Sequence, residues 1–115
     1  MAGFRINRVS EDIRREIISV IRDLKDPRVM GKLLTVVRVE VSSDASFAKV
    51  YVSDIKGIES AKEAVRGLTA ATGYIRREVG SNLHLRKTPE LKFIADDSIE
   101  QGFSMFKKLE ENRGE

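Results

Sequence analysis

The residues best suited to bind a ligand lie around Ala71-Thr72-Gly73, in the second half of the chain. Basic residues follow this stretch at positions Arg76, Arg77, Arg86, Lys87 and Lys92. Gly73 carries no side chain, so a phosphate group can approach the main chain there. If a helix starts at this stretch, its free N–H groups and positive dipole end also favour an anion. The pattern predicts a groove that follows a nucleic-acid backbone; the alternative is a solvated helix face on which Glu78 neutralises Arg77.

Other residue types that do chemistry are scarce. His84 is the only histidine, and its place between two leucines is more typical of a packing or surface residue than of a catalyst. Asp96 and Asp97 are neighbours whose carboxylates usually point apart, and a hard metal ion needs further oxygen ligands around it. The absence of cysteine excludes disulfides, thiol catalysis and cysteine-ligated metals. There is no glycine motif for binding nucleotides, so we expect no enzyme, no metal and no cofactor.

The distribution of charge favours an anionic partner. The chain of 115 residues carries a formal net charge of +3. Residues 1–92 hold 18 basic and 12 acidic side chains, whereas residues 93–115 hold 3 basic and 6 acidic ones. A basic body with an acidic end suggests nucleic acid as the partner. No apolar run exceeds three residues, so we expect a cytoplasmic protein without a membrane-spanning helix or signal peptide.

The first element that must position these residues is a helix. Apolar residues recur at steps of three and four, at Val9, Ile13, Ile17, Val20, Ile21 and Leu24. We predict Ser10 as the N-cap of this helix. The helix should end at Asp26, because Pro27 disfavours helical geometry in the residue before it.

An antiparallel hairpin should follow the helix. Alternation predicts a first strand with one face formed by Thr35, Val37, Val39 and Val41. Residues 42–46 have the composition of a turn. The second strand, residues 47–53, has one face formed by Ala48, Val50 and Val52.

The stretch that carries the chemistry lies inside a long helical pattern. Ser60 opens a capping box, and helical spacing continues well beyond it. Gly67 and Gly73 interrupt the pattern, and each costs about 1 kcal/mol relative to alanine. We therefore predict two helices that meet at a bend near Ala71-Thr72-Gly73, with Gly80 ending the second. The alternative is a single helix whose glycines allow close packing.

The remaining elements complete the fold. Residues 81–88 are predicted to form a loop, residues 90–95 a third strand, and residues from Ser98 onward a last helix. The order α-β-β-α-α-β with a C-terminal helix indicates a two-layer α+β fold, because the helices must cover the apolar face of the sheet. We expect a nucleic-acid-binding domain over residues 1–97, and a C-terminal helix with a frayed acidic tail over residues 98–115.

This order resembles that of a type II K-homology (KH) domain, in which a Gly-x-x-Gly loop between two helices clamps about four nucleotides. The present chain has Ala71-Thr72-Gly73 at the equivalent place. An Ala-x-Gly bend in such a fold resembles the ribosome-binding factor A family. Further segments that resemble this family are residues 5–9 (RINRV), 73–80 (GYIRREVG), 83–93 (LHLRKTPELKF) and 96–102 (DDSIEQG).

The resemblance implies a non-enzymatic assembly factor that binds free 30S ribosomal subunits and 16S rRNA. It implies support for late maturation, for processing of the 16S rRNA precursor and for growth in the cold, with release by a maturation GTPase. It places the rRNA contacts at Ala71, Thr72, Gly73, Arg76 and Arg77. Electrostatics adds further candidate contacts at Arg5, Arg8, Arg86, Lys87 and Lys92. We expect a monomer without a cofactor.

Two alternatives to this function stay open. One is a generic KH-type module that binds single-stranded RNA. The other is a small interaction protein that presents its acidic terminal helix to a protein partner.

Overall fold

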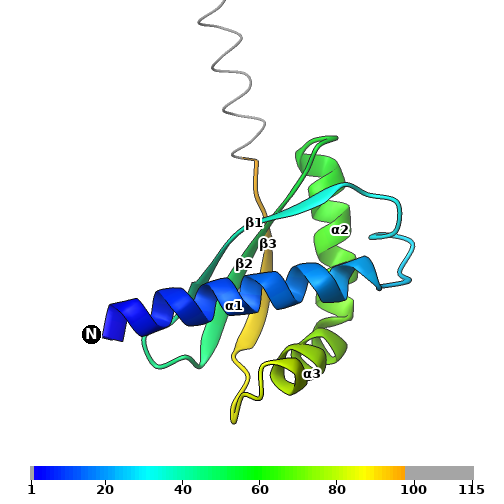
Figure 1. The fold of residues 1–115 in the computed structure, drawn as a ribbon. Helices are drawn as coiled ribbons and strands as arrows, with labels where there is room; N and C mark the ends of the chain where they lie inside the picture. The colour runs from blue at the N-terminus through cyan, green and yellow to red at the C-terminus, as the bar shows by residue number, and fades with distance from the viewer. Residues whose placement is uncertain (1, 98–115) are drawn as a thin grey trace, which may run out of the picture.

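The computed structural model describes residues 2–97, and the side chains of residues 8–97. Its elements are α1 (Ala2–Arg22), β1 (Leu34–Val41), β2 (Phe47–Asp54), α2 (Ile58–Ala70), α3 (Thr72–Asn82) and β3 (Glu90–Ala95) (Figure 1). This order confirms the predicted α+β architecture. The helix and tail predicted over residues 98–115 lie outside the described residues.

The sheet has the strand order β1-β2-β3. β1 and β2 form the predicted antiparallel hairpin, whereas β2 and β3 run parallel. A parallel pair needs a crossover connection, and α2 and α3 provide it. Leu34 of β1 lies opposite Asp54 of β2, and Val52 of β2 lies opposite Ala95 of β3. The start of β1 and the ends of the other two strands therefore meet at one end of the sheet.

β1 departs from simple alternation. Its register shifts between Val36 and Arg38, which leaves Val37 as an extra residue. Val36 and Val39 are buried, while Thr35 is exposed. The prediction that Thr35 and Val37 face the core is therefore wrong, because the extra residue reverses the alternation and turns Val36 inward instead. In β2 the alternation holds, and the predicted inward residues are fully buried: Ala48, Val50 and Val52.

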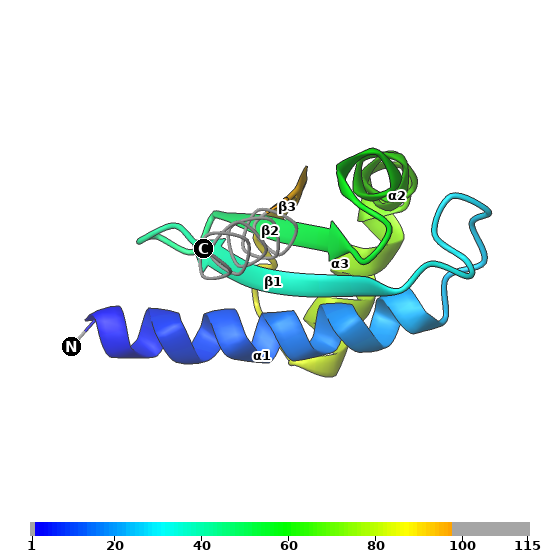
Figure 2. The same cartoon turned by 90° about the horizontal axis from the view of Figure 1, so that it is seen from above.

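The hydrophobic core lies between one face of the sheet and the helices, so the fold has the two predicted layers. Its helical side chains are Ile13, Ile17 and Val20 of α1, Leu68 of α2, and Ile75 and Val79 of α3. They pack against strand residues that include Val50, Val52 and Phe93. Figure 2 shows α1 running alongside β1. The opposite face of the sheet carries exposed charged side chains such as Lys49 and Lys92.

α1 begins earlier and ends earlier than predicted. It starts at Ala2, so Ser10 lies inside the helix rather than at its cap. The apolar spacing in fact extends backwards through Ser10 to Ile6, and a residue that favours caps does not oblige a helix to start there. The helix ends at Arg22, before Asp26, and tighter hydrogen bonds from residues 23 and 24 to the third residue before each close its last turn.

The start of α2 and the role of the glycine inside it also differ from the prediction. α2 follows Gly57, whose φ is 113°, and the Ser60 hydroxyl donates to Asp54 Oδ2 at 2.5 Å instead of capping the helix. Gly67 lies within α2 where a Cβ would be 2.9 Å from Val29 Cγ2. Close packing is therefore the reason for this glycine, as the single-helix alternative had suggested, although the helix does end at the predicted bend.

Candidate nucleic-acid interface

The bend between α2 and α3 lies where the sequence predicted it. Ala71 stands between the two helices with φ −95° and ψ 9°. Its N–H donates to the carbonyl oxygens of Gly67 and Leu68, both at 3.1 Å. Its own carbonyl oxygen accepts from the Ile75 N–H at 3.0 Å. The chain therefore changes direction while the backbone of Ala71 keeps its hydrogen bonds.

The side chain of Thr72 adds a second set of bonds at the bend. Its hydroxyl lies 2.7 Å from the carbonyl oxygen of Thr69 and 3.2 Å from that of Leu68. Both carbonyls belong to the last turn of α2, and the Leu68 oxygen also accepts from the Ala71 N–H, so the hydroxyl adds to the backbone bonds at the bend. Gly73 does not adopt the left-handed conformation that glycine favours. The bend therefore depends on Ala71 and Thr72 rather than on the conformational freedom of Gly73.

Gly73 leaves an open surface at the start of α3. It is exposed, and a Cβ built there would meet no heavy atom within 4 Å. Arg77 is exposed one helical turn later on the same side of α3. Among the described residues its guanidinium has no ion pair, and Glu78 does not neutralise it. This arrangement of bare main chain and a free cation suits a phosphate group.

Arg76 points toward the protein. Its Nε donates to the carbonyl oxygen of Pro89 at 3.0 Å, and its Nη2 donates to that of Thr88 at 2.8 Å. The side chain is half-buried, and two of its five N–H donors are thus used on the protein. Arg76 therefore fixes the start of β3 against α3, whereas Arg77 faces the solvent.

The loop after α3 folds back onto that helix. The prediction that Gly80 ends α3 is wrong, because the helix continues to Asn82. Gly80 instead lies against Thr88, and a Cβ at position 80 would collide with the Thr88 hydroxyl. The carbonyl oxygen of Gly80 also accepts from the Leu85 N–H at 3.0 Å. The glycine thus permits close approach of the loop.

This loop places a second basic group at the far end of α3. Arg86 and Lys87 are exposed on it, next to the carbonyls that Arg76 holds. α3 has 11 residues, so its two ends are about 16 Å apart. We call the surface formed by Gly73, Arg77, Arg86 and Lys87 the α3 surface.

Comparison with known proteins identifies the family of the chain. The family model of ribosome-binding factor A matches residues 5–109. The chain belongs to the ribosome-binding factor A family. A ribosome-binding factor A from Clostridium tetani is 44% identical to the chain over 116 residues, which are 97% of this chain and 95% of that protein.

Solved structures of ribosome-binding factor A share the fold. The solution NMR structure of a putative ribosome-binding factor A from Thermotoga maritima has a TM-score of 0.74 and 35% identity, and the match covers 85% of this chain and 92% of that one. A homology model of the Thermus thermophilus protein, fitted into a cryo-EM map of a 30S complex, has a TM-score of 0.64 and 29% identity over 77% of this chain and 92% of that one. The fold is KH-like, as predicted.

Two of the predicted contact residues, Lys92 and Arg8, lie apart from the α3 surface. Lys92 alternates with buried residues in β3, so it projects from the sheet face that none of the described helices covers. α1 meets the end of α3 at Glu16, which accepts a 2.7 Å hydrogen bond from Asn82. Arg8 is exposed two helical turns before this contact, on the part of α1 that precedes it. The side chain of Arg5 lies outside the described part. The structure therefore brings together only part of the predicted set.

Two exposed residues beside the bend were missed by the sequence analysis. Tyr74 is 44% exposed directly after Gly73, and Arg66 is exposed in α2. An exposed ring beside cationic side chains is typical of surfaces that bind single-stranded nucleic acid. Arg66 could have been found, because it precedes Ala70 by four residues and so lies on the same side of the helix near the bend.

The rest of the described chain offers no other chemistry of comparable strength. Residues 2–97 contain no group of three or more side chains that could hold a metal ion. None of their helices is long and apolar enough to cross a bilayer. His84 is exposed in the loop with φ 53°.

Proposed function

We propose that the chain is a non-enzymatic ribosome assembly factor that binds the free 30S subunit through 16S rRNA. Membership of the ribosome-binding factor A family supports this, as does the 30S complex of the Thermus thermophilus relative. The finer activities implied by the resemblance are part of the proposal, namely late maturation, processing of the 16S rRNA precursor and growth in the cold. We also propose a cytoplasmic monomer that a maturation GTPase releases from the subunit.

The observation that carries the proposal is the α3 surface. Gly73 leaves the main chain open at one end, and the exposed Arg77 makes no ion pair with a described residue. Arg86 and Lys87 stand at the other end. Cations on a helix and on the loop that follows it can contact different phosphates of one RNA backbone, while the exposed ring of Tyr74 offers a base a face to stack on.

The predicted contact residues take different roles in this proposal. Ala71 and Thr72 maintain the bend, and Gly73 and Arg77 contact phosphate directly. Arg76 acts as a positioning residue, because its two hydrogen bonds fix the loop that presents the Arg86–Lys87 pair. Lys92, Arg5 and Arg8 would extend the contacts beyond the α3 surface.

The mechanism is preorganisation. The bend and the loop are already held by hydrogen bonds in the free protein, so little ordering is needed on binding. A protein that binds one rRNA conformer better than another shifts the equilibrium toward that conformer by the difference in affinity. The factor would thus favour one folding state of the maturing subunit without catalysis.

The first prediction tests the α3 surface. Arg77→Glu should lower co-sedimentation with purified free 30S subunits by about tenfold, because one phosphate contact is lost and a repulsion is added. Its thermal stability should stay within 2 °C of the wild type (about 0.5 kcal/mol) because the side chain is exposed. Lys62→Glu is the matched control, since Lys62 is exposed on α2 and is not among the proposed contacts. Equal binding by Arg77→Glu and the wild type would place the rRNA contact elsewhere.

A further inference from the structure

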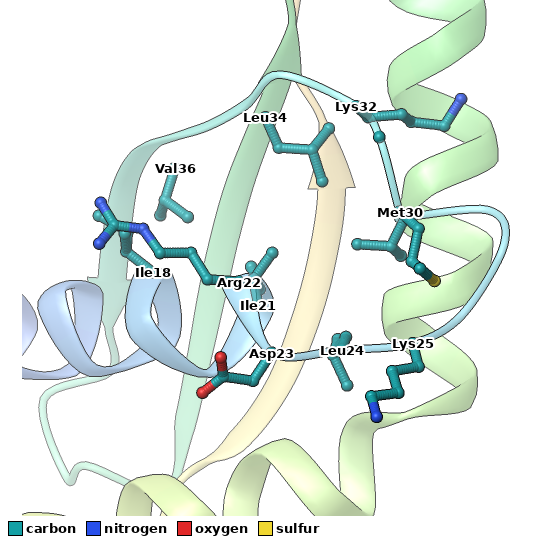
Figure 3. A pocket seen from close by; sticks show the side chains of 12 residues that line it. Ile18, Ile21, Arg22, Asp23, Leu24, Lys25, Met30, Lys32, Leu34 and Val36 are labelled. Carbon is teal, nitrogen blue, oxygen red and sulfur yellow. The ribbon is translucent and has the colours of Figure 1, made fainter.

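A groove opens away from the bend, at the end of α1. It lies between the last turns of α1, the loop of residues 23–33 and the first residues of β1, and its volume is about 790 Å³ (Figure 3). None of the residues of the α3 surface lines it. The groove is therefore a separate feature of the molecule.

The lining of the groove is aliphatic. Its floor includes Ile21, Leu24 and Leu34, and Met30 stands at its side with 55% of its surface exposed. The lining contains no aromatic side chain. Bases of single-stranded RNA are bound mainly by stacking on aromatic rings or guanidinium planes, whereas aliphatic grooves with an adaptable methionine are typical of sites for protein segments.

Exposed apolar residues continue beside the groove. Leu33 is 70% exposed and Ile55 is 75% exposed. Leu33 directly precedes Leu34, and Ile55 directly follows Asp54, and these two strand residues lie opposite each other. Leu33 and Ile55 are thus at the same end of the β1–β2 hairpin. Such a group of exposed large apolar side chains marks an interaction site.

The rim of the groove is cationic. Arg22 and Lys25 line the groove (Figure 3), and both are exposed and make no ion pair with any described residue. Lys32 also lines the groove, but its Nζ lies 3.7 Å from Glu63 Oε2 and 3.1 Å from Ser60 Oγ, so its charge is already paired and the free cations of the rim are Arg22 and Lys25. Asp23 is the one acidic residue that lines the groove. The charge is therefore complementary to a segment with acidic side chains.

The wall of the groove is preformed. Asp26 accepts from the Arg28 N–H at 2.8 Å, and its carbonyl oxygen accepts from the Met30 N–H at 2.8 Å. Val29 is buried and packs against Gly67 of α2. The loop that carries Met30 is thus fixed before any partner arrives, which lowers the entropic cost of binding.

We propose that this groove binds an amphipathic segment of a protein in the 30S subunit, one with acidic residues beside its apolar ones. The inference rests on the proposed function for the identity of the complex. The α3 surface would contact rRNA while the groove contacts protein, so that the factor recognises an RNA and a protein element together. Two contacts on one rigid body raise the affinity above that of either contact alone.

The test compares two targets with one variant. Met30→Glu/Leu33→Glu changes only exposed side chains, so it should fold like the wild type. We expect its affinity for purified free 30S subunits to fall about fivefold or more, and its affinity for protein-free 16S rRNA to stay unchanged. Unchanged affinity for 30S subunits would overturn the groove inference alone, and an equal loss on protein-free rRNA would show that the groove binds RNA. A wild-type chain that does not bind 30S subunits would overturn the proposed function as well.

Photo-crosslinking identifies the occupant. With p-benzoylphenylalanine in place of Met30, irradiation of the purified 30S complex should link the chain to a ribosomal protein, at an apolar segment flanked by Asp or Glu. The same reagent in place of Lys49 should not give this product. A crosslink to rRNA, a crosslink to residues 98–115 of the same chain, or no crosslink would each overturn the proposal.

Discussion

At the residue scale, the bend is maintained by hydrogen bonds that one hydroxyl group completes. Thr72 supplies the hydroxyl, and Gly73 beside it supplies the open surface. The two residues are adjacent, yet Thr72 stabilises the conformation of the bend, whereas Gly73 leaves the main chain accessible to a ligand. Substitutions at the two positions should therefore have opposite effects on stability.

Gly73→Ala should leave the bend unchanged and raise the free energy of unfolding by up to about 1 kcal/mol, because alanine is the better helix former and the added methyl meets nothing. The affinity for 30S subunits should fall, because the methyl occupies space that the phosphate would approach. Denaturant unfolding, a structure of the variant and sedimentation measure the three effects.

Thr72→Val is the comparison variant for the bend. It should lower the free energy of unfolding by about 1 kcal/mol, since the carbonyls of Leu68 and Thr69 lose the hydroxyl. If Gly73→Ala straightens the bend and Thr72→Val leaves the free energy of unfolding unchanged, then Gly73, and not Thr72, maintains the bend.

Arg76 offers a prediction that separates positioning from direct contact. Arg76→Lys keeps the positive charge but lacks the planar fork that reaches both Thr88 and Pro89. We expect it to weaken 30S binding nearly as much as Arg76→Ala does, and the amides of residues 85–88 should exchange faster in both variants. If Arg76→Lys binds like the wild type, the charge itself contacts the rRNA.

At the element scale, the loop between α1 and β1 depends on one acidic residue. The side-chain hydrogen bond from Arg28 lowers the pKa of Asp26 from 3.8 to about 2. Asp26 accepts from the Arg28 Nε at 3.0 Å and from its Nη2 at 2.8 Å. The same residue accepts from the Arg28 backbone N–H, so its charge holds the loop that forms one wall of the groove.

The sign of the pH effect follows from this lowered pKa. The stabilising contribution of Asp26 is complete above pH 3.8 and is lost as the pH falls toward about 2. We expect the NMR signal of the Arg28 amide to titrate with a midpoint near pH 2, the pKa of Asp26 in the folded chain, and Asp26→Asn to abolish the titration. A local signal is needed because the pKa of Asp44, in the β1–β2 turn, is also lowered to about 2 by hydrogen bonds from Ser46 and Ser42. A midpoint near 3.8 for the Arg28 amide would contradict the assignment.

At the scale of the whole molecule, the cations divide between faces. Arg77, Arg86 and Lys87 are exposed on the α3 surface, whereas Lys92 projects from the other face of the sheet. If these three cations contact phosphates, the logarithm of the 30S affinity should fall with the logarithm of the salt concentration with a slope of about −2 to −3. Filter binding at several salt concentrations measures it. A slope near zero would exclude phosphate contacts.

The order of elements and the bend followed from local sequence, because helical spacing, alternation and glycine each act over a few residues. The β1 bulge did not, since the adjacent Val36 and Val37 break the alternation without showing which of the two faces the core. The inward direction of Arg76 also could not be predicted, because its acceptors lie 12 and 13 residues later in the chain and meet it only after β3 pairs with β2. The roles of Gly67 and Gly80 likewise depend on distant partners.

The crossover between β2 and β3 has a consequence for how the protein can change. The only covalent route from β2 to its parallel neighbour β3 runs through α2, the bend and α3, so the proposed RNA contacts and the closing of the sheet depend on one segment. Parallel pairing joins residues far apart in sequence and forms late for entropic reasons. A substitution that straightens this segment should therefore slow refolding as well as weaken binding. Evolution can change the proposed RNA contacts only by substitutions that still allow β3 to pair with β2.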